Sequence, residues 1–226
     1  CDNMCTFCVV PFTRGRERSR DPQSIIVEIN DLWNRGFKEV TLLGQNVDSY
    51  LWYGGGLKKE FSKASDIQKA TAVGFANLLE MCANAQPKMR FRFSTSNPQD
   101  MTLDVIETMA KHNNICNYIH LPVQSGNSRI LKMMNRTYDS VWYKERVDAI
   151  RRIIPDCAIS SDIIVGFPGE TEDDFAETMS LLEKVRYTEI YSFIYSPRRG
   201  TTAADMADDM PAEVKHEQFN RMLELQ

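Results

Sequence analysis

The chain has 226 residues, which is enough for one large domain with its own core, because single α/β barrels commonly exceed about 200 residues. Hydrophobic residues make up 42% of it and charged residues 26%, as in ordinary globular proteins, and no apolar run reaches the roughly 18 residues needed to cross a membrane. The net charge of −4 argues against a surface that binds nucleic acid throughout. We therefore expect one domain over residues 1–226, without a membrane partner.

Three of the six cysteines lie within the first eight residues, at Cys1, Cys5 and Cys8, whereas Cys82, Cys116 and Cys157 are scattered. This distribution does not suit a framework of paired disulfides, and it favours a cytoplasmic location. The chain opens on a cysteine, without an initiator methionine or a signal-peptide pattern, so we expect it to be a piece of a longer protein.

A basic strip follows the cysteines in the segment TRGRERSR. Its members are Arg14, Arg16, Arg18 and Arg20. The strip borders the cysteines, which favours a functional role; a solvated loop is the alternative interpretation of such a charge run.

Helix and strand patterns then alternate. Asp21 and Pro22 are typical of a helix start, and apolar residues recur on one helical face up to Gly36. Five segments indicate buried strands with polar ends: KEVTLLGQNV, MRFRFSTSNP, YIHLPVQSG, AISSDIIVGFPGE and EIYSFIYSPR. Amphipathic helices are predicted over Leu103 to Lys111, Val141 to Ile154 and Phe175 to Val185. The segment Tyr53 to Thr71 lacks periodicity and indicates a surface insertion.

This alternation predicts an α/β fold with parallel strands and crossover helices, and in such barrels the chemistry lies at the carboxyl ends of the strands. With five strands, and with a first strand before Cys1 not in the chain, we expect a partial, open TIM-like β/α barrel. The polar strand ends and the cysteine loop should then share one mouth.

The spacing of Cys1, Cys5 and Cys8 allows one loop to wrap one metal centre. A structural zinc ion needs four protein ligands, and no fourth Cys or His lies nearby. Three unrelated core cysteines are a weaker alternative, because the intervening Asp2, Asn3 and Thr6 form no apolar face. An iron–sulfur cluster with three thiolates has one open iron, which can coordinate a small chelating cofactor.

The motif Cys-x3-Cys-x2-Cys, with Phe7 before the last cysteine, resembles the signature of the radical S-adenosylmethionine (SAM) superfamily. The resemblance implies a [4Fe-4S] cluster whose open iron chelates SAM and whose electron yields a 5′-deoxyadenosyl radical. The longer string CDNMCTFCVVPFTRGRERSR, with LLGQNVDSY, HLPVQSGN and DIIVGFPGET, resembles the tRNA methylthiotransferases over most of the chain. GQNVDSY and CVVPFTRG are similar to the type that acts on N6-isopentenyladenosine next to the anticodon.

The resemblance also implies contacts to SAM. The backbone of Phe7 would lie near the adenine, and Gly44, Gln45 and Asn46 would meet the methionine amino group, with a simple strand-to-loop turn as the alternative. Hydroxyls and an amide at other strand ends would bind the ribose and carboxylate: Ser94, Ser96, Gln124 and Ser125. Arg136 would pair with the SAM carboxylate, or be an exposed arginine at a helix end. The adenine would be walled by Ile164, Val165 and Tyr195, or these are ordinary core.

In this family an N-terminal domain holds an auxiliary [4Fe-4S] cluster, and a small RNA-binding barrel follows the core; neither domain is in this chain. We expect core packing for Cys82, Cys116 and Cys157 rather than a second cluster. The expected function is addition of a methylthio group to carbon 2 of the modified adenine, with the tRNA anticodon stem-loop as partner and a flavodoxin or ferredoxin as electron donor. About two of the four arginines should contact RNA phosphates, and the others should serve the fold through carboxylate or backbone partners.

Two alternatives stay open. One is a methylthiotransferase for another substrate, either a ribosomal-protein aspartate or tRNA threonylcarbamoyladenosine. The other is a non-catalytic module in which the cysteine loop binds zinc and the arginines bind RNA.

Overall fold

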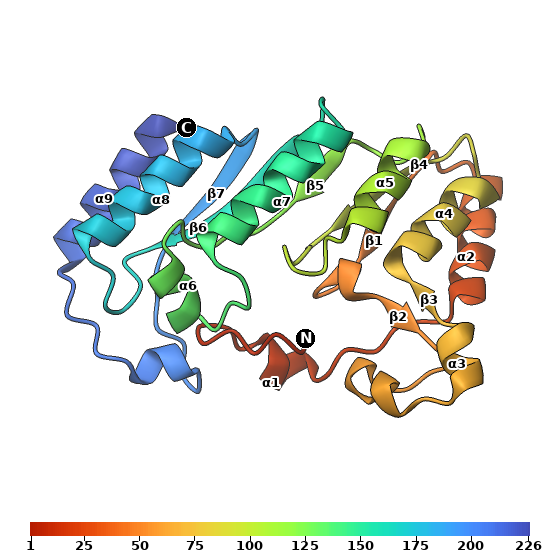
Figure 1. Ribbon diagram of the computed structural model, residues 1–226, viewed down its shortest axis with the longest axis horizontal. Coiled ribbons are helices and arrows are strands. Elements are labelled where there is room, and N and C mark those ends of the chain that lie inside the picture. Colours follow the sequence, from red (N-terminus) through yellow and green to blue (C-terminus); the bar gives the residue numbers. More distant parts are fainter. The chain divides into compact units, whose positions relative to one another are not determined.

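The structure is a computed structural model that describes residues 1–226, and the chain forms two compact units. The first unit comprises Cys1–Gly15, His120–Ala149 and Ala158–Gln226, and the second comprises Arg16–Ile119 and Ile150–Cys157. Strands and helices alternate along the chain (Figure 1).

The second unit is built on two parallel strands, β1 (Glu39–Leu43) and β4 (Arg90–Ser94), which pair residue for residue over their full lengths. Phe91 and Phe93 alternate with polar residues along β4 and are buried, and Phe93 packs edge to face on Phe75 with ring centroids 5.2 Å apart. Because the strands are parallel and in register, the segments that follow them lie at one edge of the sheet, where the Val47 N–H donates to the Thr95 carbonyl at 3.0 Å.

Three helices pack in this unit, α2 (Pro22–Asn34), α4 (Phe75–Ala85) and α5 (Leu103–Lys111). The Asp21 carboxylate accepts from the Ser24 N–H at 3.0 Å and Pro22 is the first helical residue, so α2 starts where its sequence predicts. The helix predicted over Leu103 to Lys111 is confirmed by α5.

The segment Tyr53 to Thr71 is largely surface, as predicted, but it is regularly structured. It lies between the two-residue strands β2 (Leu51–Trp52) and β3 (Val73–Gly74), which pair antiparallel. It contains the 3-10 helix η2 (Lys58–Lys63) and the helix α3 (Asp66–Ala70), which a capping box at Ser65 starts. Helices this short leave too few turns for a periodic sequence pattern.

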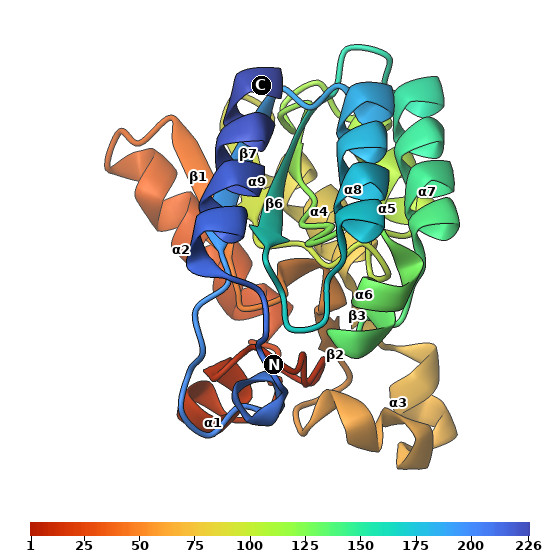
Figure 2. The same cartoon turned by 90° about the vertical axis from the view of Figure 1, so that its left-hand side faces the viewer.

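The first unit contains the parallel strands β6 (Ala158–Val165) and β7 (Glu189–Ile194). The sheet order is β5 (Tyr118–His120, whose first two residues belong to the second unit), β6, β7. Helix α8 (Glu172–Val185) joins β6 to β7, and α9 (Ala212–Leu225) packs against β7 and α8 (Figures 1 and 2). The remaining helices are α1 (Val10–Arg14), α6 (Ser128–Met133), α7 (Ser140–Ile153, whose last residues belong to the second unit) and the 3-10 helix η3 (Thr202–Asp205).

Glycine is required where the β5–α6 loop packs on α8. A Cβ on Gly126 would lie 2.5 Å from the Thr178 Cα, and backbone at that distance cannot move aside easily. The Gly126 N–H also donates to the Thr178 hydroxyl at 3.0 Å. This contact fixes the loop that follows β5.

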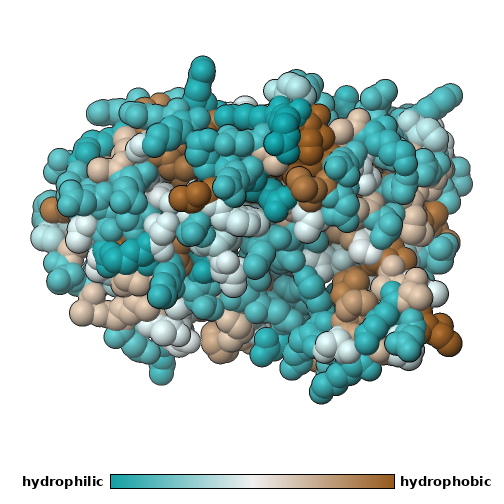
Figure 3. All heavy atoms as spheres, viewed as in Figure 1, coloured by the Kyte–Doolittle hydropathy of each residue, from teal (hydrophilic) through white to brown (hydrophobic).

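All five predicted strands are confirmed, and they fall into separate parallel sheets rather than a closed ring, as expected for an open barrel. Helix α9 was not predicted, because the sequence around its start is dominated by acidic residues. None of the helices has the length and apolar character needed to cross a membrane. The face seen in Figure 3 is mostly hydrophilic.

Candidate functional site

The cysteine loop, residues 1–9, is part of the first unit and carries three free, half-buried thiols. A backbone turn from the Cys8 N–H to the Cys5 carbonyl, at 3.1 Å, sets the spacing of the last two cysteines. Met4, directly before this turn, has a left-handed φ of 50°. The thiols of Cys5 and Cys8 are therefore presented by a compact turn rather than by a helix or strand.

Thr6 fixes this loop to the rest of the unit. Its N–H donates to the Met134 carbonyl at 3.1 Å, and its hydroxyl donates to the Met133 carbonyl at 2.9 Å, at the end of α6. Its own carbonyl accepts from the Ala203 N–H at 2.9 Å. Sequence reasoning missed Thr6, because all three partners are distant along the chain.

No three side chains among His, Cys, Asp and Glu converge as ligands of a single metal ion do. A structural zinc site requires four ligands around one ion. Thiolates of a [4Fe-4S] cluster bind different irons, so they need not converge on one point. The set of three thiolate donors in one loop fits the cluster.

Arg136 is half-buried after α6 and points at the cysteine loop rather than into solvent. Its Nη1 donates to the Cys5 Sγ at 3.3 Å, its Nη2 donates to the Pro122 carbonyl at 3.0 Å, and its guanidinium lies 5.4 Å from the Tyr138 ring centroid. Its Nε is buried without a partner. Burial lowers the pKa of Arg136, but Tyr138 and Cys5 outweigh it, so the pKa is raised and the group stays charged. The alternative of an exposed arginine at a helix end is wrong.

The predicted adenine wall is partly assembled. Ile164, Tyr195 and the ring of Phe7 pack in one hydrophobic cluster of the first unit. Val165 is fully buried, and because neighbouring residues of a strand point to opposite faces it lies away from Ile164. The structure therefore favours the alternative that Val165 is an ordinary core residue and not part of the adenine wall.

Gln124 and Ser125 follow β5. Gln124 has a left-handed φ of 77° and its carbonyl accepts from the Ile164 N–H at 2.9 Å, so its backbone continues the sheet. The Ser125 hydroxyl is fully buried, 3.3 Å from that of Thr178, and it accepts from the Asn127 N–H at 3.2 Å. The contacts of Ser125 are thus accounted for by the packing of the loop on α8.

In the second unit the predicted residues follow β1 and β4. Gly44 and Gln45 are exposed, Ser94 is half-buried, and Asn46 and Ser96 are buried. Three buried oxygens have no hydrogen-bond partner, and we call their side chains the polar pocket: Asn46 Oδ1, Asp48 Oδ2 and Ser96 Oγ.

Asp48 was not singled out from the sequence. Its Oδ1 accepts from the Asn97 N–H at 3.1 Å. Burial raises the pKa of the Asp48 carboxyl well above its ordinary value, and the charge of Asp100 raises it further, although the Asn97 N–H and the nearby Ser96 hydroxyl lower it. Only the tertiary structure shows that Asp48 is buried in the polar pocket, because in the sequence a polar residue after a strand is typical of an exposed loop.

The four arginines of the basic strip are all exposed, and they are not equivalent. Arg20 pairs with Glu28 and donates to the Ser24 carbonyl at 3.1 Å, so it holds the start of α2. Arg14 belongs to the first unit, whereas the others belong to the second. The expectation that some of them serve the fold is met by Arg20.

The remaining cysteines lie apart from the loop. Cys82 and Cys157 are buried, and burial raises the pKa of each thiol to about 12. Cys116 is half-buried and lines a hollow of about 540 Å³ with Arg90 and Arg92, at the amino end of β4. Burial raises the pKa of this thiol too. These surroundings agree with core packing for Cys82 and Cys157, whereas Cys116 lies at the edge of the core beside the hollow.

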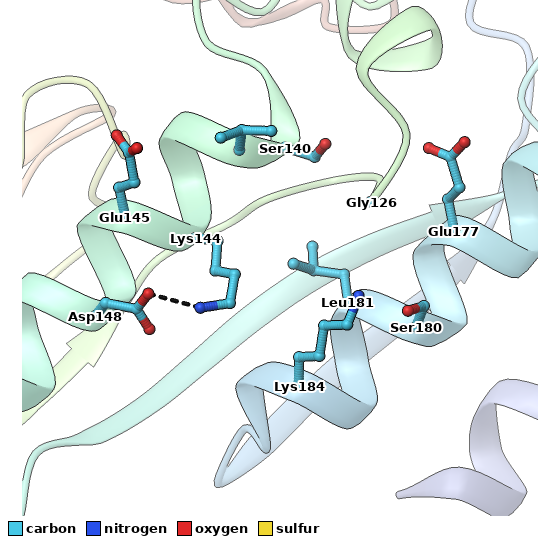
Figure 4. A pocket seen from close by; sticks show the side chains of 10 residues that line it. Gly126, Ser140, Lys144, Glu145, Asp148, Glu177, Ser180, Leu181 and Lys184 are labelled. Atoms are coloured by element: carbon cyan, nitrogen blue, oxygen red, sulfur yellow. Dashed lines mark hydrogen bonds and ion pairs between the residues drawn. The ribbon is translucent and has the colours of Figure 1, made fainter.

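A groove of about 410 Å³ lies between α7 and α8 (Figure 4). Its wall includes Lys144, which pairs with Asp148 at 2.6 Å, and Glu177 and Lys184 of α8. It holds no cysteine and no residue predicted to bind SAM.

Residues 1–182 match the family model of the radical SAM superfamily. The chain is 65% identical over 227 residues to a tRNA-2-methylthio-N(6)-dimethylallyladenosine synthase of Christiangramia forsetii, covering 100% of this chain and 47% of the relative. A synthase of the same name from Clostridium botulinum is 50% identical, with 100% and 47% covered. The chain spans about half the length of these curated relatives.

Two solved structures share the fold at low identity. A radical S-adenosylmethionine methyltransferase from Kitasatospora setae, with cobalamin and a [4Fe-4S] cluster bound, matches with a TM-score of 0.63 and 14% identity, over 90% of this chain and 37% of that one. A methylornithine synthase matches with a TM-score of 0.53 and 16% identity, over 100% of this chain and 59% of that one.

Proposed function

The chain belongs to the radical SAM superfamily, and we propose that it is the catalytic core of a tRNA methylthiotransferase. The complete protein adds a methylthio group to carbon 2 of N6-isopentenyladenosine next to the anticodon. The single observation that carries the proposal is the cysteine loop, which holds three free thiols within eight residues and has the Arg136 guanidinium on Cys5. The substrate is proposed from the names of relatives up to 65% identical.

Cys1, Cys5 and Cys8 would hold a [4Fe-4S] cluster, which when bound supplies the electron that cleaves SAM. Deprotonation of three thiols adds negative charge to a half-buried loop, and the Arg136 guanidinium offsets part of it at Cys5. Thr6 holds the loop against the end of α6 and against η3, so the spacing of the thiols does not depend on the loop alone.

For SAM we propose contacts in each unit. In the first unit, Phe7, Ile164 and Tyr195 would exclude water from the adenine. In the second, Gly44, Gln45 and Asn46 would receive the amino group, and Ser94 and Ser96 would offer hydroxyls, of which that of Ser96 is buried and unpartnered. In the first unit Gln124 also remains a proposed polar contact.

The reaction also needs parts outside this chain. We propose that the complete protein holds an auxiliary [4Fe-4S] cluster, takes electrons from a flavodoxin or ferredoxin and acts in the cytoplasm. The tRNA anticodon stem-loop is the proposed partner, with Arg14, Arg16 and Arg18 as candidates for phosphate contacts.

The test uses the complete protein, purified and reconstituted without oxygen. Alanine at Cys1, Cys5 or Cys8 should abolish formation of 5′-deoxyadenosine from SAM, whereas the matched control Cys82→Ala should keep it. The parent should also produce the methylthio nucleoside in digests of tRNA that carries isopentenyladenosine. Continued SAM cleavage by a loop variant, or stoichiometric zinc in the parent in place of iron and sulfide, would contradict the proposal.

A further inference from the structure

We propose that Lys58, in the segment between β2 and β3, is a positioning residue for SAM binding. It holds the carboxylate of Asp100, which in turn fixes the side-chain amide of Asn46. This inference rests on the proposed function, because it takes Asn46 as a SAM contact. It gives the segment Tyr53 to Thr71 a role in the reaction.

Two hydrogen bonds to one carboxylate form the link. The Asn46 Nδ2 donates to the Asp100 Oδ2 at 2.7 Å, and the Lys58 Nζ donates to the Asp100 Oδ1 at 3.1 Å. Each oxygen thus has its own donor. All three side chains are partly or largely shielded from solvent, so the pair Lys58–Asp100 is less screened than an exposed ion pair.

The backbone that carries Asp100 is itself held in place. Asp100 and Met101 donate their N–H groups to the Asn97 carbonyl at 2.9 and 3.1 Å, and the Asn97 N–H donates to Asp48. The carboxylate therefore has a fixed base next to the polar pocket, and its remaining freedom is rotation of the side chain. Lys58 restricts that rotation.

The orientation of the Asn46 amide follows from the charge of Asp100. An ionised carboxylate only accepts hydrogen bonds, so it selects the NH₂ group of the amide and directs the carbonyl oxygen away from itself. That oxygen, Asn46 Oδ1, is buried and unpartnered. If the Asp100 carboxylate turned away, the amide could rotate and present NH₂ in place of the carbonyl.

Lys58 holds the Asp100 carboxylate in place through the ion pair at 3.1 Å. The ammonium also offsets the negative charge that Asp100 brings close to the buried Asp48. Lys58 is the lysine of the segment between β2 and β3 that bonds to Asp100. Without its ammonium group, this segment would provide no cation that bonds to Asp48 or Asp100.

The pocket that this link orients offers polar atoms for hydrogen bonds to a ligand. The side chains with unpartnered oxygens are nearly inaccessible, with 8% of Asn46, 5% of Asp48 and 5% of Ser96 exposed. Buried polar atoms are normally paired, so unpaired ones mark a place where a ligand supplies the partner.

The segment presents Lys58 on a well-defined turn. The Tyr53 hydroxyl donates to the Leu57 carbonyl, directly before Lys58, at 2.7 Å, and the Tyr53 ring packs on Phe61 with centroids 5.2 Å apart. Gly56 has a φ of 105°, and a Cβ there would lie 2.7 Å from the Tyr53 hydroxyl, so only glycine fits.

The test measures SAM-dependent formation of 5′-deoxyadenosine by the reconstituted complete protein. Lys58→Met should raise the KM for SAM about tenfold, the effect of one charge-assisted hydrogen bond, with kcat little changed. Lys58→Arg should restore most of the affinity, because it keeps a charged donor. The matched control is Lys59→Met, which removes an exposed lysine from the same 3-10 helix and should leave KM unchanged.

Asn46→Ala separates this inference from the proposed function. It should raise KM at least as much as Lys58→Met, and the double variant should be no worse than Asn46→Ala alone, because both changes act through one amide. If Asn46→Ala raises KM and Lys58→Met only lowers the melting temperature, the positioning role is overturned while the proposed function stands. If Asn46→Ala leaves KM unchanged, Asn46 is not a SAM contact, and the positioning role of Lys58 is overturned as well. If the parent protein forms no 5′-deoxyadenosine, the proposed function itself is contradicted.

Discussion

The cysteine loop of the first unit and the polar pocket of the second hold their reactive atoms in different ways. The loop keeps its thiols half-buried, and its shape comes from backbone hydrogen bonds, from Thr6 and from one guanidinium. The pocket buries its oxygens and leaves three of them unpartnered. A loop of this kind suits a large ligand bound by strong bonds, whereas the pocket suits a ligand that supplies only hydrogen bonds.

Each unit also contains one buried acid whose pKa is raised, and the two acids differ in their partners. Glu170, in the turn after β6, accepts from the Gly166 N–H at 2.6 Å, whereas the Oδ2 of Asp48 has no partner. The comparison indicates that Glu170 is structural and that Asp48 belongs to a site. The following changes test both comparisons.

Glu170→Gln should remove a pH dependence of stability. Burial raises the pKa of Glu170 from 4.5 to about 7. Between these values the folded state keeps a proton that the unfolded state has lost, so stability falls as pH rises through this window and is level above it. The loss is at most about 3 kcal/mol, at about 1.4 kcal/mol per pH unit. Glutamine keeps the bond to Gly166 without titrating.

The measurement is the free energy of unfolding in urea, for parent and variant, at several pH values. The other titrating groups are the same in both proteins, so their contributions cancel in the difference between the two free energies. A variant whose stability falls as steeply as the parent's between pH 4.5 and 7 would show that Glu170 is not the group responsible.

Arg136→Met should lower both stability and iron content. It removes two hydrogen bonds made by a charged donor, to Cys5 and to the Pro122 carbonyl, and such bonds contribute about 1.5–3 kcal/mol each when a partner is lost. Urea unfolding and iron analysis after anaerobic reconstitution measure the two effects. Arg136→Lys keeps the charge but not the two donors of the guanidinium, so its stability and iron content should lie between those of the parent and of Arg136→Met. A fully iron-loaded methionine variant would mean that the guanidinium serves the fold alone.

Thr6→Val should loosen the loop at a cost of about 1 kcal/mol, the contribution of one neutral hydrogen bond. The backbone bonds of residue 6 remain, so the iron content should fall less than in Arg136→Met. Thr13→Val is a matched control, because the Thr13 hydroxyl bonds only within its own helix. Equal iron loss in both variants would contradict a specific role for Thr6.

Arg18→Ala and Arg20→Ala should differ in their effect on RNA binding. If Arg18 contacts a phosphate, its loss flattens the dependence of log affinity on log salt by about 0.7 for a single strand. Arg20 is engaged by Glu28 and Ser24, so its loss should leave the salt slope unchanged and affect α2. Titration of tRNA at several salt concentrations measures both, and an unchanged slope for Arg18→Ala would make that arginine a solvated surface residue.

The sequence by itself determined the features that depend on local spacing. The three thiols of one loop, the five strands with polar ends, the start of α2 at Asp21 and the bounds of α5 all follow from residues within a few positions of each other. Cys82 and Cys157 were also placed in the core correctly, because Cys82 lies in a helical pattern and Cys157 directly precedes a strand.

Only the tertiary structure decided which distant side chains complete each site. Arg136 is 131 positions from Cys5, and Asp100 is 54 positions from Asn46. No periodicity links such residues, because their contact depends on how strands and helices pack. Lys58 lies in a segment without a periodic pattern, and its position depends on a turn to which Gly56 and the Tyr53 hydroxyl contribute. The packing of strands and helices determines which residues far apart in the sequence share a hydrogen bond. The spacing of the three cysteines, in contrast, can be read directly from the sequence.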